Sequence, residues 1–97
     1  MFSTAEILRI LRIKKQELQK KYPISELALF GSYARGDFNE QSDIDILIDF
    51  SERIDSFDYI RIAHEFEDTF QHKIDLVSRK GIKLRYLPYL NKDLIHV

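Results

Sequence analysis

Apolar residues recur at helical spacing near the start of the chain and again in its second half. Ser3 and Glu6 fit a capping box, and the apolar pattern that follows, which Pro23 stops, predicts a helix over residues 4–21. The residues at this spacing are Ile7, Leu8, Leu11 and Leu18. A second stripe predicts a helix over residues 56–70, with Ser56 as its cap. This stripe consists of Tyr59, Ala63, Phe66 and Phe70, with Ile60 and Ile62 beside it.

Between and after these helices, three segments have the length and alternation of strands. Residues 27–30 form a short apolar run that ends at a glycine, and a brief helical stretch is expected over residues 32–35. Residues 44–50 and 73–78 predict the second and third strands. In the third strand, Ile74 and Leu76 are expected on one face, and Asp75 and Val77 on the other.

The last part of the chain predicts a further helical segment over residues 82–90, interrupted near Pro88. Its residues Tyr86, Leu87, Tyr89 and Leu90 are expected to pack on the sheet. The alternation of helices and strands predicts an α/β (α+β) fold, a small mixed β-sheet packed with helices. The 97 residues include three glycines and two prolines, and nothing marks a linker, so residues 1–97 are expected to form a single domain.

The charge is unevenly distributed although the net charge is only −1. Residues 1–21 carry +4, residues 22–78 carry −9, and residues 79–97 carry +4. Proteins that follow a polynucleotide backbone more often carry an excess of Lys and Arg, so nucleic acid is disfavoured as the main substrate. The absence of cysteine excludes thiolate metal sites. The N-terminal residues do not resemble a signal segment, and no run is long enough to cross a bilayer, so a cytoplasmic protein without a membrane partner is expected.

The acidic middle of the chain contains the residues with the clearest chemistry. Asp43 and Asp45 lie at the start of the second predicted strand, and because side chains alternate they share a face. Like charges this close raise one pKa or require a cation, and carboxylate oxygens are the ligands that Mg2+ prefers. Gly31 and Ser32 form a turn at the end of the preceding strand, where ligands commonly bind. The combination indicates a metal-dependent nucleotide site.

With these residues identified, the chain resembles a minimal nucleotidyltransferase domain of the DNA polymerase β superfamily. The pattern of that family is glycine-serine, ten residues, and aspartate-x-aspartate, which Gly31-Ser32 and Asp43-Ile44-Asp45 satisfy without insertion. A third carboxylate is expected on a following strand, and Asp75 occupies that place. The resemblance covers most of the chain and implies the polymerase-β-like fold.

The resemblance also implies roles for these residues. Gly31 and Ser32 are expected to bind the triphosphate of ATP, and Asp43, Asp45 and Asp75 to be the catalytic and metal-binding residues. They are expected to hold two Mg2+ ions, and Mn2+ suits the same oxygen ligands. Arg35 fits either a phosphate contact or a solvated helix end, and the sequence leaves both readings open.

The acceptor of the nucleotide is the open part of this prediction. Stand-alone domains of this kind resemble the antitoxins of modules whose other half is a HEPN-type ribonuclease toxin. That resemblance implies a protein adenylyltransferase that moves AMP from ATP to a tyrosine hydroxyl of the toxin and forms a hetero-oligomer with it. Two alternatives remain: an antitoxin that neutralises its toxin by binding alone, and a nucleotidyltransferase acting on a small hydroxylated molecule.

Overall fold

The computed structural model describes residues 2–82 and 87–97 and contains a four-stranded sheet in that part of the chain. The strands are β1 (Ile24–Phe30), β2 (Ile44–Phe50), β3 (Ile74–Ser78) and β4 (Ile95–His96), in the order β3-β2-β1-β4. β1 pairs antiparallel with β2 and with β4, and β2 pairs parallel with β3. The predicted mixed sheet is therefore confirmed.

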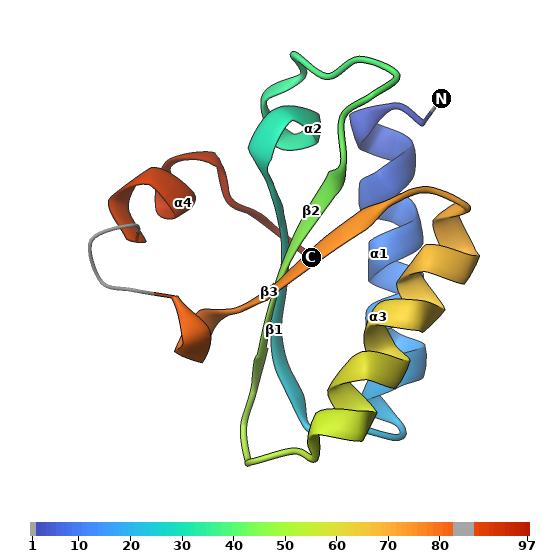
Figure 1. Cartoon of the computed structure of the whole chain (residues 1–97), viewed down its shortest axis with the longest axis vertical. Helices are drawn as coiled ribbons and strands as arrows, with labels where there is room; N and C mark the ends of the chain where they lie inside the picture. The colour runs from blue at the N-terminus through green and yellow to red at the C-terminus, as the bar shows by residue number, and fades with distance from the viewer. Residues whose placement is uncertain (1, 83–86) are drawn as a thin grey trace.

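Helices cover the two faces of this sheet unequally (Figure 1). α1 (Thr4–Gln19) and α3 (Ser56–Phe70) pack on one face, and the shorter α4 (Leu87–Asp93) lies on the other. α3 also supplies the long connection that the parallel pair β2–β3 requires. α2 (Gly31–Arg35) is a short helix in the connection between β1 and β2.

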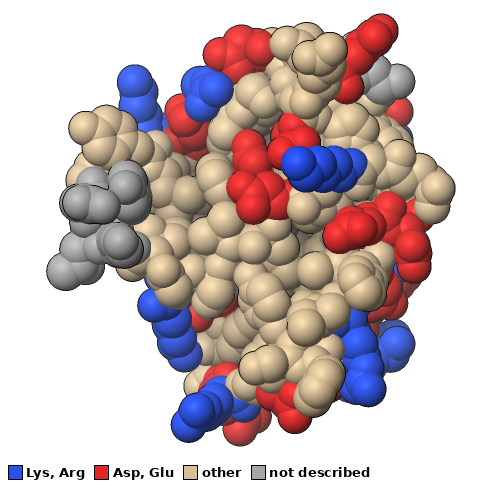
Figure 2. Space-filling model, viewed as in Figure 1, with Lys and Arg blue, Asp and Glu red and all other residues tan. Residues whose placement is uncertain are grey.

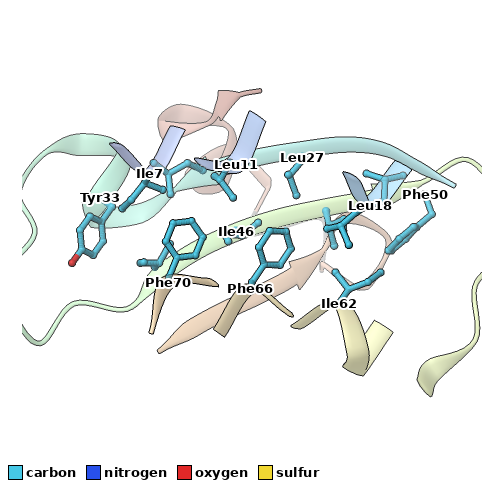
Figure 3. Packing of buried hydrophobic residues seen from close by; sticks show 14 residues of the cluster. Ile7, Leu11, Leu18, Leu27, Tyr33, Ile46, Phe50, Ile62, Phe66 and Phe70 are labelled. Carbon is cyan, nitrogen blue, oxygen red and sulfur yellow. The ribbon is translucent and has the colours of Figure 1, made fainter. Parts of the chain in front are cut away.

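The main core lies between the sheet and the pair α1 and α3 (Figure 3). Phe66 and Phe70 of α3 point toward Ile46 of β2, with Ile7 and Leu11 of α1 beside them. All five of these residues are at most 2% exposed. Burial of their apolar surface is the main favourable term that holds the two helices on this face.

The first helix follows its sequence signals at its start and ends slightly earlier than predicted. Ser3 accepts a hydrogen bond from the Glu6 N–H, and the Glu6 carboxylate accepts one from the Ser3 N–H, which confirms the capping box. The helix ends at Gln19 rather than at residue 21. Pro23 disfavours helical backbone at the residue before it, and the chain needs a turn there to enter β1.

The helix over residues 56–70 has the predicted bounds, but its predicted cap is wrong. Ser56 is the first helical residue, and Asp55 is the cap, with its side chain accepting a hydrogen bond from the Phe57 N–H at 2.7 Å. Both residue types cap helices well, and Asp55 is the one with extended backbone. Ile60 is 48% exposed, so it lies at the margin of the buried stripe.

The sheet is larger than predicted in two places. β1 begins at Ile24, three residues before the predicted start, with an irregularity in its pairing between Ile24 and Glu26. β4 was not predicted, because two residues are too few to show alternation. Its Ile95 and His96 pair with Leu29 and Ala28 of β1.

The predicted helical segment over residues 82–90 is confirmed for residues 87–90, which belong to α4, although α4 continues to Asp93 and Ile82 is not helical. Residues 83–86, including Tyr86, lie outside the described residues. A short 3-10 helix (Arg79–Gly81) precedes this stretch, and Pro88 lies in the first turn of α4, where proline is tolerated. Leu90 is buried as expected, whereas Tyr89 is 77% exposed. None of the helices among the described residues combines the length and apolar character that crossing a bilayer requires.

Candidate active site

The glycine-serine turn lies directly against one of the paired aspartates. β1 ends at Phe30, and the antiparallel register places Phe30 opposite Asp45 of β2. Gly31 follows with a φ of +74°, a backbone conformation that glycine adopts without the cost paid by other residues. A Cβ atom at Gly31 would overlap the Oδ2 atom of Asp45. The glycine is therefore required both by the backbone and by the close approach of the carboxylate.

The third predicted carboxylate also reaches this point, because β2 and β3 are parallel neighbours. Their register pairs Asp45 with Asp75, so the two side chains are adjacent on the same face. Partial burial, followed by the charges of Asp75 and Asp43, raises the pKa of Asp45 to about 6. A hydrogen-bond contribution from Asp75 also raises the pKa of Asp45. Asp45 and Asp75 thus crowd like charges into a single small volume.

Asp43 is placed differently from the other two acids. It precedes the first residue of β2, and its Oδ2 atom lies 3.7 Å from Nζ of Lys73. Its charge reaches Asp45 and contributes to the raised pKa of that carboxyl group. Within residues 2–82 and 87–97, no three acidic or imidazole side chains are grouped closely enough to hold one ion. The structure therefore brings Asp45 and Asp75 together and leaves Asp43 beside Lys73.

The glycine-serine turn, Asp45 and Asp75 line one cavity of about 700 Å3, a size within the usual range of small-molecule sites. Its polar wall contains Ser32, Arg35, Asp45, Asp75 and Asp93. Its apolar wall contains Phe30, Val77, Ile82, Tyr89 and Leu90, and Gly31 and Gly81 complete the lining. Acidic side chains gather near the middle of the face seen in Figure 2, and basic side chains lie mostly toward its rim. The cavity thus joins an acidic end to an apolar wall, as a phosphate-bearing aromatic ligand with a bound cation would require.

Two residues of the cavity tie α4 to the glycine-serine turn. Nη1 of Arg35 donates to Oδ2 of Asp93 at 2.9 Å, and its Nε donates to Asp37 at 3.1 Å. These hydrogen bonds raise the pKa of Arg35, so its guanidinium stays charged. The sequence leaves the role of Arg35 open, and it gives no indication of Asp93 because the two residues lie far apart along the chain. Tyr89 was also missed as a cavity residue, since its apolar neighbours favoured packing on the sheet.

The side chains of the acidic pair fit a divalent cation by their chemistry. Both offer carboxylate oxygens, the ligand type that Mg2+ and Mn2+ prefer. The raised pKa of Asp45 has like-charge repulsion among its causes, and a cation between the two carboxylates would relieve that repulsion. Asp45 and Asp75 are the residues placed to hold a metal, and Asp43 is adjacent in the chain but contacts Lys73.

The sequence matches a family model described as a nucleotidyltransferase domain over residues 11–95. A protein of Methanocaldococcus jannaschii, provisionally named a protein adenylyltransferase, is 41% identical over 101 residues, with the whole of both chains covered. The protein adenylyltransferase MntA of Thermococcus cleftensis is 32% identical over 97 residues, which cover 100% of this chain and 98% of that protein.

Solved structures share the fold. One, provisionally described as a minimal nucleotidyltransferase, superposes with a TM-score of 0.82 at 28% identity and covers 99% of this chain and 97% of its own. A structure of a tri-AMPylated HEPN toxin in complex with an MNT antitoxin, from Shewanella oneidensis, gives a TM-score of 0.63 at 18% identity. That match covers 96% of this chain and 66% of the other, and at this identity it concerns the fold alone.

Proposed function

This chain belongs to the nucleotidyltransferase domain family, and from that premise we propose that it is a protein adenylyltransferase antitoxin. In this proposal it transfers AMP from ATP to a tyrosine hydroxyl of a HEPN-type ribonuclease toxin and depends on Mg2+. The observation that carries the proposal is the Asp45–Asp75 pair beside the Gly31–Ser32 turn, within one cavity. The names of the similar adenylyltransferases support the reaction, and the fold shared with an antitoxin bound to an AMPylated toxin supports the partner.

The glycine-serine turn binds the triphosphate in this proposal. Gly31 has no side chain, so the backbone can approach phosphate oxygens closely, and Ser32 adds a hydroxyl donor. Both residues line the cavity next to the acidic pair. The apolar lining of the cavity, which includes Phe30 and Val77, gives the adenine ring a surface on which to pack.

Asp43, Asp45 and Asp75 would hold the divalent ions in this proposal, which requires the Asp43 carboxylate to exchange its contact with Lys73 for one with the metal. A bound Mg2+ supplies positive charge that stabilises the departing pyrophosphate and lowers the pKa of the attacking hydroxyl. Asp75 orients that hydroxyl and accepts its proton, for which it needs only hydrogen-bond reach. The tyrosine oxygen forms a bond to the α-phosphorus, the bond from that phosphorus to the bridging oxygen breaks, and pyrophosphate leaves.

The test measures AMP on the partner. The purified chain is incubated with a candidate HEPN-type toxin, ATP and Mg2+, and both proteins are weighed by intact mass spectrometry. An AMP increment on the toxin is expected, and removal of the metal with EDTA is expected to abolish it. Asp45→Asn and Asp75→Asn are expected to lose the increment, whereas Asp68→Asn, an exposed acid of α3, serves as the matched control.

Two results would contradict the proposal. If the toxin gains no AMP and Asp45→Asn protects cells as well as the unmodified chain does, the chain neutralises its partner by binding alone. If the purified chain instead adenylylates a small hydroxylated molecule and leaves the toxin unmodified, the acceptor has been assigned to the wrong class. Peptide mapping of the modified toxin tests whether the acceptor is a tyrosine.

A further inference from the structure

A tyrosine of this chain lies at the wall of its own candidate active site. Tyr89 lines the same cavity as Asp45, Asp75 and Ser32, and 77% of its surface is exposed. Its hydroxyl belongs to the same chemical class as the proposed acceptor. We propose that Tyr89 is itself an AMP acceptor, so that the chain adenylylates its own α4 in cis; this inference rests on the proposed function.

Other tyrosines among the described residues are held away from the cavity. Tyr33 is 1% exposed and stacks on Phe38 with ring centroids 4.2 Å apart. Tyr59 donates its hydroxyl to the Leu76 carbonyl at 3.0 Å, and Tyr22 packs against the main core. Within residues 2–82 and 87–97, Tyr89 is the tyrosine that lines the cavity of the acidic pair.

The position of Tyr89 is fixed by contacts on both sides of it in the chain. Leu90 is 8% exposed and packs against Ala28 and Leu47 of the sheet. Asp93, one turn further on, is held by Arg35 of α2 at 2.9 Å. These contacts hold α4 over the cavity, and because neighbouring helical side chains diverge, Tyr89 lies at the rim while Leu90 points into the sheet.

The proposed step uses the same co-substrate as the proposed reaction. The Tyr89 Oη forms a bond to the α-phosphorus of ATP, the bond from that phosphorus to the bridging oxygen breaks, and pyrophosphate leaves. The phenolic proton passes to Asp75, and from there to solvent. The product carries AMP on the rim of the cavity, where it obstructs the next ATP, so self-modification is expected to slow transfer to the partner.

The experiment weighs the full chain after incubation with ATP and Mg2+ in the absence of any partner. An AMP increment on the chain is expected, and tandem mass spectrometry of its peptides is expected to place it on Tyr89. Tyr89→Phe removes only a hydroxyl from an exposed side chain and is expected to lose the increment. Tyr22→Phe, which removes a hydroxyl away from the cavity, is expected to keep it.

Mixing two variants tests whether the reaction occurs within one chain. The Tyr89→Phe chain retains the acidic pair but lacks the acceptor, and the Asp45→Asn chain retains the acceptor but lacks the acidic pair. AMP on the Asp45→Asn chain would therefore show transfer from one chain to another and would overturn the proposal that each chain modifies itself. AMP on another residue, or no AMP on a chain that still modifies its partner, would overturn it while leaving the proposed function intact. Loss of both reactions would contradict the proposed function and this inference together.

Discussion

The two faces of the sheet differ in what their side chains contribute. The face toward α1 and α3 is a continuous apolar core that includes Ile46, Phe66 and Phe70. The face toward α4 has a much smaller buried cluster, formed by Ala28, Leu47 and Leu90. This second face, the one toward α4, also carries acidic side chains on neighbouring strands, among them Asp45 and Asp75. The first face therefore stabilises the fold through apolar burial, and the second face holds the like charges of the candidate site close together.

The charged groups of the second face are compensated in one place and left crowded in another. Glu26 and Asp49 are paired across β1 and β2, and Arg79 donates two hydrogen bonds to Glu26. These hydrogen bonds are the main reason that the pKa of Glu26 is lowered to about 2. At the other end of β2, Asp45 has a pKa raised to about 6 by burial and by neighbouring acids. The contrast is between an acid that accepts hydrogen bonds from an arginine and a carboxyl group that lies beside other acids.

The largest expected effect is on the apolar face. Phe66→Ala removes a fully buried ring, and a loss of about 3–5 kcal/mol in the free energy of unfolding is expected. Urea denaturation followed by circular dichroism measures it. Phe57→Ala, in the same helix but 71% exposed, is the matched control and is expected to change stability little. Equal losses in both variants would contradict the assignment of the core to this face.

On the second face, one substitution is expected to separate activity from stability. Asp45→Asn removes a crowded charge, so nucleotidyl transfer is expected to fall by about 100-fold or more. The free energy of unfolding is not expected to fall, because the repulsion with Asp75 is relieved. Transfer assays and urea denaturation on the same sample measure the two quantities. A destabilised Asp45→Asn chain would show that the pair contributes to the fold rather than to the chemistry.

The two ends of α2 offer a comparison of two glycines with positive φ. Gly31→Ala combines positive φ with overlap of the Asp45 carboxylate, and a loss of about 2 kcal/mol is expected. Gly36→Ala also has positive φ, at +87°, but meets open space, so it measures the backbone cost alone. Thermal unfolding of both variants isolates the cost of the overlap. Identical shifts would mean that Asp45 moves aside freely.

The smallest expected effect concerns the compensated end of the second face. Glu26 has its pKa lowered from 4.5 to about 2, chiefly by hydrogen bonds from Arg79. A lowered folded-state pKa stabilises the fold above pH 4.5, and that contribution is lost as the pH falls toward 2. Glu26→Gln is expected to cost about 1 kcal/mol at neutral pH, and less as the pH falls. Urea denaturation between pH 7 and low pH measures the loss in free energy of unfolding, with Glu40→Gln, at an exposed position, as the control. If Glu26→Gln costs the same at every pH, the ion-pair explanation is contradicted.

Local sequence signals are sufficient to predict a helix start or a strand where the whole pattern lies within one short segment. The capping box at Ser3 and the alternation over residues 44–50 each lie within a few positions, and both are confirmed. The cap of α3 is wrong by one residue because Asp55 and Ser56 are both good caps. β4 was missed because its two residues form a strand only by pairing with β1.

The amino-acid sequence by itself determined the acidic residues, the glycine-serine turn and the order of the main elements, because spacing and alternation are properties of the chain alone. Only the tertiary structure decided that Asp45 pairs with Asp75 while Asp43 contacts Lys73, and that Arg35 reaches Asp93. The register of β2 and β3 places Asp45 beside Asp75, and the docking of α4 brings Asp93 to Arg35. Both depend on contacts between residues distant in sequence, which no local pattern encodes.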